Sequence, residues 1–197
     1  KMEEAFLSAV IMGIVFVQNV TMLEVWEGML KWLEQMTGTT NYAVTFSITF
    51  AISIIIPVLL LGLTSWIAGK FNKSSLIENF TRFGYAIIAL DMAGHIAHNL
   101  FHLLAEGKSI FYTALGLFGT EVHGASPAIL SMEAIQLLQF GLIALGFLGS
   151  LYTAYRISKS HHSGEKVWGT FVPFAALMVV LTIMNVVLFT LPMAMRM

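Results

Sequence analysis

The sequence predicts an all-α integral membrane protein, a bundle of five transmembrane helices with one further amphipathic helix at the membrane interface. Two observations predict this class. Among the 197 residues, 57% are hydrophobic and 11% are charged, and the mean hydropathy is +0.82. In soluble domains about a quarter of the residues are charged. The apolar residues also gather in five runs, each near the roughly 20 residues that a helix needs to cross a bilayer. We expect one transmembrane domain covering residues 1–197.

The first predicted span and the amphipathic helix follow each other directly. Residues 5–23 are almost entirely apolar and form the first span. In residues 22–36, Leu, Met and Trp recur at helical spacing between charged residues. This pattern is typical of a helix that lies in the interface, with Trp26 and Trp32 as anchors.

The second and third predicted spans cover residues 41–69 and 80–105. Pro57 lies inside the second span, and because proline cannot donate a backbone hydrogen bond we expect a kink there, where Ser53 can help satisfy the freed carbonyl. The third span contains three histidines.

The fourth and fifth predicted spans cover residues 127–155 and 168–191. Ser126 and Pro127 fit an N-cap and a first-turn proline of the fourth span. That span also contains a group of glycines, which let another helix approach closely: Gly141, Gly146 and Gly149.

Basic residues in the loops predict the orientation. They form one group between the second and third spans and another between the fourth and fifth: Lys70, Lys73 and Arg82, then Arg156, Lys159 and Lys166. By the positive-inside rule both loops face the cytoplasm, which places the N-terminus inside and the C-terminus outside a prokaryotic inner membrane. The outer connection at 106–126 is half apolar, and we expect it to fold back over the outer surface or to dock on a partner.

Composition also excludes several kinds of site. The formal net charge is -1 and no Lys/Arg cluster occurs, which argues against a nucleic-acid partner. The chain has no cysteine, so disulfides, thiolate zinc sites and Cys-ligated iron–sulfur clusters within it are excluded. Any metal must be held by His, Met, Asp or Glu.

A stripe of ionisable residues marks the third span: Asp91, His95, His98 and His102. At 100° per residue these residues fall within an arc of roughly 60°, and at 1.5 Å per residue they extend roughly 16 Å from mid-membrane toward the outer surface. Glu106 continues the line. Hydrogen bonding to neighbouring helices is one explanation. Because ionisable groups are costly in hydrocarbon, four on one face favour a functional site.

Haem b is one candidate ligand of the stripe, since neutral imidazole is a standard axial ligand. His95, His98 and His102 are the candidate ligands. The other four spans contain no histidine, so the second axial ligand would be His123 of the outer connection, a methionine such as Met132 or Met22, or a residue of another subunit.

A non-haem metal site and a proton relay are the other candidates. His98 and His102 can share a copper, zinc or iron ion, with Asp91 or Glu106 as a carboxylate ligand or orienting group and His95 as a further ligand. Histidine titrates near neutrality and therefore also suits a proton relay that serves a quinone pocket or a permease, in which Glu106 and Glu133 exchange protons.

Two segments resemble a known family: FGYAIIALDMAGHIAHNLFHLLAEGK at 83–108 and SLYTAYRI at 150–157. They are similar to the membrane region of bacterial polyferredoxin-type electron-transfer proteins, the group associated with quinol oxidation in nitrate and nitrous-oxide respiration. The A-G-H-x-A-H-N-x-x-H run at 93–102 is the most specific part. The resemblance implies a membrane module that passes electrons between the quinone pool and periplasmic or cluster-bearing partners. This chain departs from the family in lacking cysteine, so any cluster would belong to another segment or subunit.

Together these features predict a membrane subunit of a respiratory-type electron-transfer complex that binds haem b or another metal through the stripe and exchanges electrons with quinone. We expect it to be an accessory subunit rather than a complete enzyme, in contact with the bilayer and with other redox subunits. The alternatives are a divalent-metal or proton permease that uses the same stripe, and a purely structural subunit.

Overall fold

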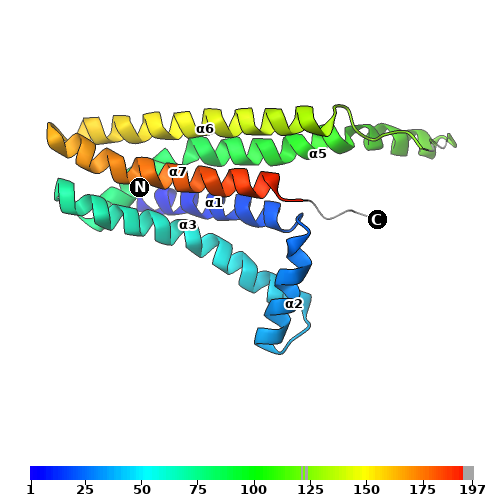
Figure 1. Cartoon of the computed structure of the whole chain (residues 1–197), viewed down its shortest axis with the longest axis horizontal. Coiled ribbons are helices and arrows are strands. Elements are labelled where there is room, and N and C mark those ends of the chain that lie inside the picture. The colour runs from blue at the N-terminus through cyan, green and yellow to red at the C-terminus, as the bar shows by residue number, and fades with distance from the viewer. Residues whose placement is uncertain (121, 123, 193–197) are drawn as a thin grey trace.

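The computed structural model describes residues 1–120, 122 and 124–192, and all regular structure in these residues is helical. The elements, shown in Figure 1, are α1 (Met2–Val20), α2 (Val25–Thr37), α3 (Tyr42–Asn72), α4 (Leu76–Phe83), the short 3₁₀ helix η1 (Gly84–Ala86), α5 (Ile88–Leu117), α6 (Met132–His161) and α7 (Glu165–Thr190).

Four of these helices, α1, α3, α6 and α7, are each long and apolar enough to cross a membrane. A fifth span results if α4, η1 and α5, which bend by 40° at their junction, are counted as one. Large apolar side chains point outward, such as Leu137 at 73% and Leu145 at 68% exposure, as expected of a surface that contacts lipid. The prediction of a helical integral membrane protein is confirmed at this level, with four to five spans.

The third predicted span is not one continuous helix, which corrects the 80–105 prediction. The helix breaks at η1, where Gly84 packs so tightly on α1 that a Cβ there would lie 2.4 Å from the Ala5 Cβ. Ser8 holds this contact by donating from Oγ to the Gly84 carbonyl at 2.7 Å. At its other end α5 continues to Leu117, so much of the predicted outer connection at 106–126 is helical.

The start of α6 also differs from the prediction. Its N-cap is Ser131, whose Oγ accepts from the Ala134 N–H at 3.3 Å. Residues 126–131 are not helical because this backbone pairs with α5: the Lys108 N–H donates to the Pro127 carbonyl at 3.0 Å, and the Ile129 N–H donates to the Leu104 carbonyl at 2.7 Å. Ser126 and Pro127 therefore precede the helix instead of capping it.

Pro57 lies inside α3, which stays helical from Tyr42 to Asn72. The carbonyl that proline leaves without a helical donor is the one four residues earlier, that of Ser53. It faces Gly13 of α1, where a Cβ would lie only 2.5 Å from the Ser53 oxygen and 2.6 Å from the Ile54 Cα. From this contact α3 diverges from α1 and α7 toward α2 (Figure 1).

Small residues bring α5 and α6 together over much of their length. A Cβ at Gly146 would lie 2.4 Å from the Ala93 Cβ, and one at Gly149 would lie 3.0 Å from the Ala89 Cβ. The predicted close approach is found at these two glycines, whereas nothing lies within 4 Å of a Cβ at Gly141. The core continues to the stacked rings of Phe83 and Phe174, whose centroids are 3.7 Å apart.

The two basic groups lie at the same end of the bundle, where α3 ends and where α6 meets α7 (Figure 1). Buried asparagines fix the first of these turns: Asn72 Nδ2 donates to Asn79 Oδ1 at 3.0 Å, and Asn79 Nδ2 donates to the Ser65 carbonyl at 3.1 Å. This shared end is what the positive-inside rule requires, and the orientation itself stays a prediction. At the opposite end α2 extends away from the bundle beside the start of α3, and α5 projects beyond α1, α6 and α7 (Figure 1).

Candidate functional site

One face of α5 carries four polar residues in a row, which we name the polar line: Asp91, His98, His102 and Glu106. Their exposure rises along the helix. Asp91 is 2% exposed and His98 is 9% exposed, whereas the side chains of His102 and Glu106 are 32% and 44% exposed. The line therefore starts in the interior of the bundle and reaches the surface at the end where α5 projects.

Asp91 stands at the inner end of the polar line. Both of its carboxylate oxygens are buried without a hydrogen-bond partner among the described residues. The helix around it is fixed by α6, because Ser150 Oγ accepts from the Leu90 N–H at 3.1 Å. An ionised carboxylate in such a place costs many kcal/mol, so Asp91 is expected to hold a proton at rest.

A second oxygen without a described partner lies one turn further along α5. Asn185 of α7 is fully buried, and its Nδ2 donates to the Leu181 carbonyl at 2.9 Å and to Met12 Sδ at 3.6 Å. Its Oδ1 accepts no hydrogen bond within the described part of the chain. This oxygen approaches α5 where Gly94 lacks a side chain, since a Cβ there would be 3.2 Å from it. Asn185 thus supplies an acceptor between Asp91 and His98.

His98 is oriented by α1. Its Nδ1 lies 3.2 Å from Asn19 Oδ1, and Asn19 Nδ2 donates to the Val15 carbonyl at 2.8 Å, which sets the direction of the amide. Because Asn19 Oδ1 can only accept, His98 Nδ1 carries the hydrogen and donates it. The lone pair of a neutral His98 is then on Nε2.

His102 and Glu106 complete the outer half of the line. His102 Nδ1 lies 3.3 Å from Glu106 Oε2, which places the donating hydrogen on Nδ1. The His98 and His102 rings meet edge to face, with centroids 5.1 Å apart. The two imidazoles are therefore in contact, and Glu106 connects them to the exposed end of the helix.

His95 does not join the polar line, although the sequence places it on the same face. It is half-buried and lines an open groove of about 300 Å³ together with Ile96, Asn99, Leu100 and Leu103. The helices that cover Asp91 and His98 do not extend over this flank of α5. The predicted stripe therefore divides into an interior line and one histidine at the side.

The other predicted site residues lie apart from the line. Glu133 is exposed in the first turn of α6, and Met132 beside it is 53% exposed. His123 lies outside the described residues. Instead of Glu133, the buried Gln139 connects α6 to α5, donating from Nε2 to the Ala97 carbonyl at 3.0 Å. Its sequence signal is an amide in an otherwise apolar stretch of α6, three residues after Gln136.

The predicted metal ligands do not form one coordination sphere. Within the described residues, no three His, Asp or Glu side chains gather closely enough to hold a metal ion. His102 contacts both His98, with ring centroids 5.1 Å apart, and Glu106, at 3.3 Å from Nδ1 to Oε2, but these three do not form a metal-binding group.

Comparison of the chain with protein-family models, with curated proteins and with solved structures found no match.

Proposed function

We propose that this chain is a membrane subunit of an electron-transfer complex, and that its polar line carries protons between one membrane surface and Asp91. The observation that carries the proton part is Asp91 itself, a carboxyl group with two buried oxygens and no described partner, at the inner end of a row of titratable groups. A purely structural carboxylate would be expected to have a partner.

The proposed path has three steps. Glu106 exchanges protons with water and with His102, whose Nδ1 it contacts. His98 keeps its Nδ1 hydrogen on Asn19, and takes up and releases the travelling proton at Nε2. A water between the two rings, which are in contact, carries that proton to Nε2 of His102, and His102 then releases its Nδ1 hydrogen to Glu106. The step from His98 to Asp91 spans about two helical turns, roughly 10 Å, and needs a bridging water, for which Asn185 Oδ1 is the available acceptor.

Haem b, copper, zinc and iron remain proposals for the same histidines. His98 has the orientation of a ligating histidine, because its Nδ1–H is donated to an amide oxygen and its lone pair is on Nε2. Among the described residues, no third His, Asp or Glu side chain joins His98 and His102 to complete a metal site. A haem or metal therefore requires a further ligand such as Met22, His123 or a residue of another subunit, whereas a proton relay requires only bridging water in addition to the residues described.

The electron-transfer part of the proposal rests on the resemblance of 83–108 and 150–157 to polyferredoxin-type membrane regions. Under this proposal, the iron–sulfur centres belong to a partner, because the chain has no cysteine. The polar line exchanges the protons that quinone takes up or releases when it is reduced or oxidised. The basic end of the bundle faces the cytoplasm, and Glu106 faces outward.

Oxidised and dithionite-reduced absorption spectra, with elemental analysis of the same sample, test the cofactors. We expect no haem band and no stoichiometric metal in the chain purified alone. A sharp band on reduction that is lost in His98→Ala and retained in His95→Ala would replace the relay by a haem site.

Proton flux into liposomes that contain the purified chain distinguishes the subunit from a permease. With a potassium diffusion potential and an internal pH dye, we expect no steady flux, because the described line ends at Asp91. Sustained flux that Asp91→Asn abolishes would establish the permease instead.

A further inference from the structure

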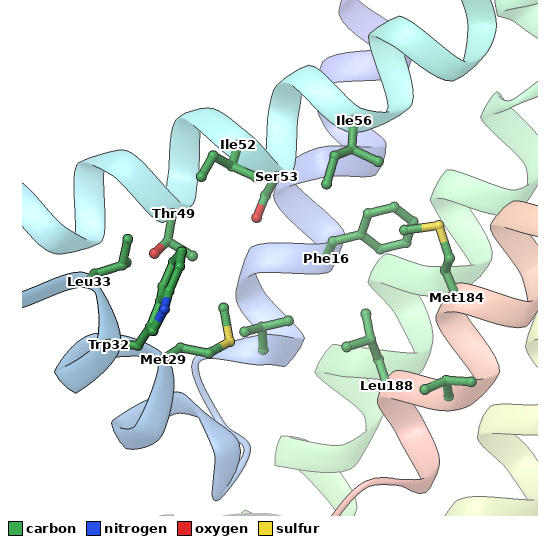
Figure 2. A pocket seen from close by; sticks show the side chains of 12 residues that line it. Phe16, Met29, Trp32, Leu33, Thr49, Ile52, Ser53, Ile56, Met184 and Leu188 are labelled. Atoms are coloured by element: carbon green, nitrogen blue, oxygen red, sulfur yellow. The ribbon is translucent and has the colours of Figure 1, made fainter. Parts of the chain in front are cut away.

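A groove opens at the place where α3 leaves the bundle, and we name it the α3 groove. Its volume is about 350 Å³, and four helices line it. Figure 2 shows Ile52, Ser53 and Ile56 of α3 facing Phe16 of α1, with Trp32 of α2 at one end and Leu188 of α7 opposite. The contact between Gly13 and Ser53 holds α3 against α1, and the divergence of α3 beyond it makes room for the groove.

The lining of the α3 groove is apolar. Apart from the hydroxyls of Thr49 and Ser53 and the indole N–H of Trp32, its side chains are aliphatic, aromatic or methionine. The Thr49 hydroxyl is already used, since it donates to the Thr45 carbonyl at 3.1 Å. Among the described residues, no ionisable side chain lines the groove, so these residues offer nothing to neutralise a carboxylate or to exchange a proton with a quinone head group.

The size of the α3 groove favours a chain-like ligand. Its volume is within the range of small-molecule pockets, about 300–1,000 Å³. A hydrocarbon chain is about as wide as one aliphatic side chain and can lie along a groove of this size between the lining side chains. Met29 and Met184 in the lining can adapt to such a chain.

The groove is open toward the bilayer and lies beside a charged helix. Ile52, Ile56 and Val187 in its lining are 48%, 37% and 47% exposed, so a chain can enter sideways from the lipid. α2, which supplies Trp32, also carries Glu27, Lys31 and Glu34. An amphipathic helix with these charges, such as α2, lies at the level of the lipid head groups. The α3 groove lies next to it, on the side of the hydrocarbon.

We propose that the α3 groove binds one acyl chain of a bilayer phospholipid, with the head group at the level of α2. This inference is independent of the proton relay, because the groove is formed by α1, α2, α3 and α7 and includes no residue of α5. The esterified chain, which has no charge of its own, matches a lining without ionisable groups.

The test uses nanodiscs that contain phosphatidylcholine with a photoactivatable group near the end of one acyl chain. After illumination, mass spectrometry of peptides locates the attached lipid. We expect attachment to concentrate on groove residues such as Met29, Ile56 and Met184, and lipid to remain bound in about one copy through detergent purification.

Ile56→Trp fills the groove and is expected to remove most of this attachment, and Ile52→Trp is a second filling variant in case the first folds poorly. Leu145→Trp is the control, because Leu145 is 68% exposed on α6 and outside the groove. Equal labelling of the outward-facing residues of α3 and α6, or labelling that survives both filling variants, would overturn the proposal. Displacement of the label by an isoprenoid quinone, but not by excess phospholipid, would also overturn it and assign the groove to a quinone tail.

Discussion

The carboxyl group of Asp91 has the most unusual environment of any side chain in the candidate site. It is 2% exposed, and its oxygens have no hydrogen-bond partner among the described residues. A group in such a place lowers stability unless it is uncharged or solvated by buried water. Under the proposed function, proton exchange accounts for this carboxyl group in the interior.

Replacing Asp91 by asparagine tests whether this carboxyl group has a structural role. The amide has nearly the same shape and no ionisable proton, so we expect Asp91→Asn to melt at the same temperature as the wild type or above it. Thermal unfolding in detergent, followed by circular dichroism, is the measurement. A loss of more than about 2 kcal/mol, the penalty for breaking a buried hydrogen bond to a charged group, would show that Asp91 has a structural partner.

Asn19 is predicted to set the hydrogen position on His98. In Asn19→Leu the buried Nδ1–H loses its acceptor, which costs about 1–3 kcal/mol, and the preference for hydrogen on Nδ1 disappears. Unfolding in denaturant and the nitrogen NMR shifts of the His98 ring measure the two effects.

Asn99→Leu is the matched control for Asn19→Leu, because Asn99 is exposed and, in the part of the chain that the structure describes, its side chain bonds to the His95 carbonyl of its own helix at 2.8 Å. Equal destabilisation by both substitutions, with an unchanged His98 tautomer, would contradict the assignment.

His162, just after α6, gives a pH dependence outside the spans. Burial of the ring lowers the pKa of His162 below its ordinary value, and the positive charges of Arg82, His161 and Lys166 lower it further. The unfolded chain therefore binds this proton more readily, so stability is complete above about pH 6.5, the ordinary histidine value, and falls as the pH drops below it.

We expect His162→Gln to weaken this loss of stability on the acidic side, measured as the slope of melting temperature between pH 7 and pH 5. His161→Gln, which removes only one of the positive charges that lower the pKa of His162, is expected to change the slope less than His162→Gln. An identical slope in His162→Gln and in the wild type would disprove the prediction.

The helices are held together at glycines where backbones nearly touch. Gly146 of α6 is one such position, where a Cβ would lie 2.4 Å from the Ala93 Cβ and 2.9 Å from the Ala89 carbonyl oxygen. The neighbours at Gly146 are a Cβ and backbone atoms, so they cannot turn aside as a flexible side chain would. The separation of α5 and α6 is set there.

Gly146→Val is predicted to force α5 and α6 apart and to cost about 1–3 kcal/mol, the usual range for overpacking. Gly141→Ala on the same helix has open space around its Cβ and gains helix propensity, so we expect it to be neutral or slightly stabilising. Chemical unfolding of both variants is the measurement. Similar stability of Gly146→Val and the wild type would contradict the packing of α5 on α6.

The elements that follow from local apolar patterns are predictable from the sequence, and those set by tertiary contacts are not. The long apolar runs indicate α1, α3, α6 and α7 correctly. The break before α5 depends on Gly84 meeting Ala5 of a distant helix, and the late start of α6 depends on residues 127 and 129 pairing with the backbone of α5. Neither contact has a signal in the local sequence. Ser126 and Pro127, for example, fit the start of a helix as well as they fit the non-helical segment that the structure shows.

At the scale of the whole molecule, the polar line and the α3 groove lie on different sides of α1. Asn19 faces α5 and contacts His98, while Phe16 and Val20 line the groove. One short helix thus separates a polar interior from an apolar, lipid-facing space.

The candidate site is predictable from the sequence only along its own helix. Helical periodicity indicates that Asp91, His98, His102 and Glu106 share a face, and this is what the structure shows. The same periodicity includes His95, which lies beside an open groove because the neighbouring helices cover only one flank of α5. The partners Asn19, Gln139 and Asn185 come from three other helices, and which of their turns face α5 depends on helix packing.

The rate at which the Asp91 carboxyl proton exchanges with solvent tests the central claim most directly. In infrared spectra recorded after transfer to D₂O, the carboxylic-acid band that is absent from Asp91→Asn belongs to Asp91. We predict that His98→Leu and His102→Leu slow its exchange by about a hundredfold, the lower end of what a positioned proton-transfer group contributes, while His95→Leu leaves the rate unchanged. Absence of such a band at neutral pH, or equal exchange in all three variants, would contradict the account.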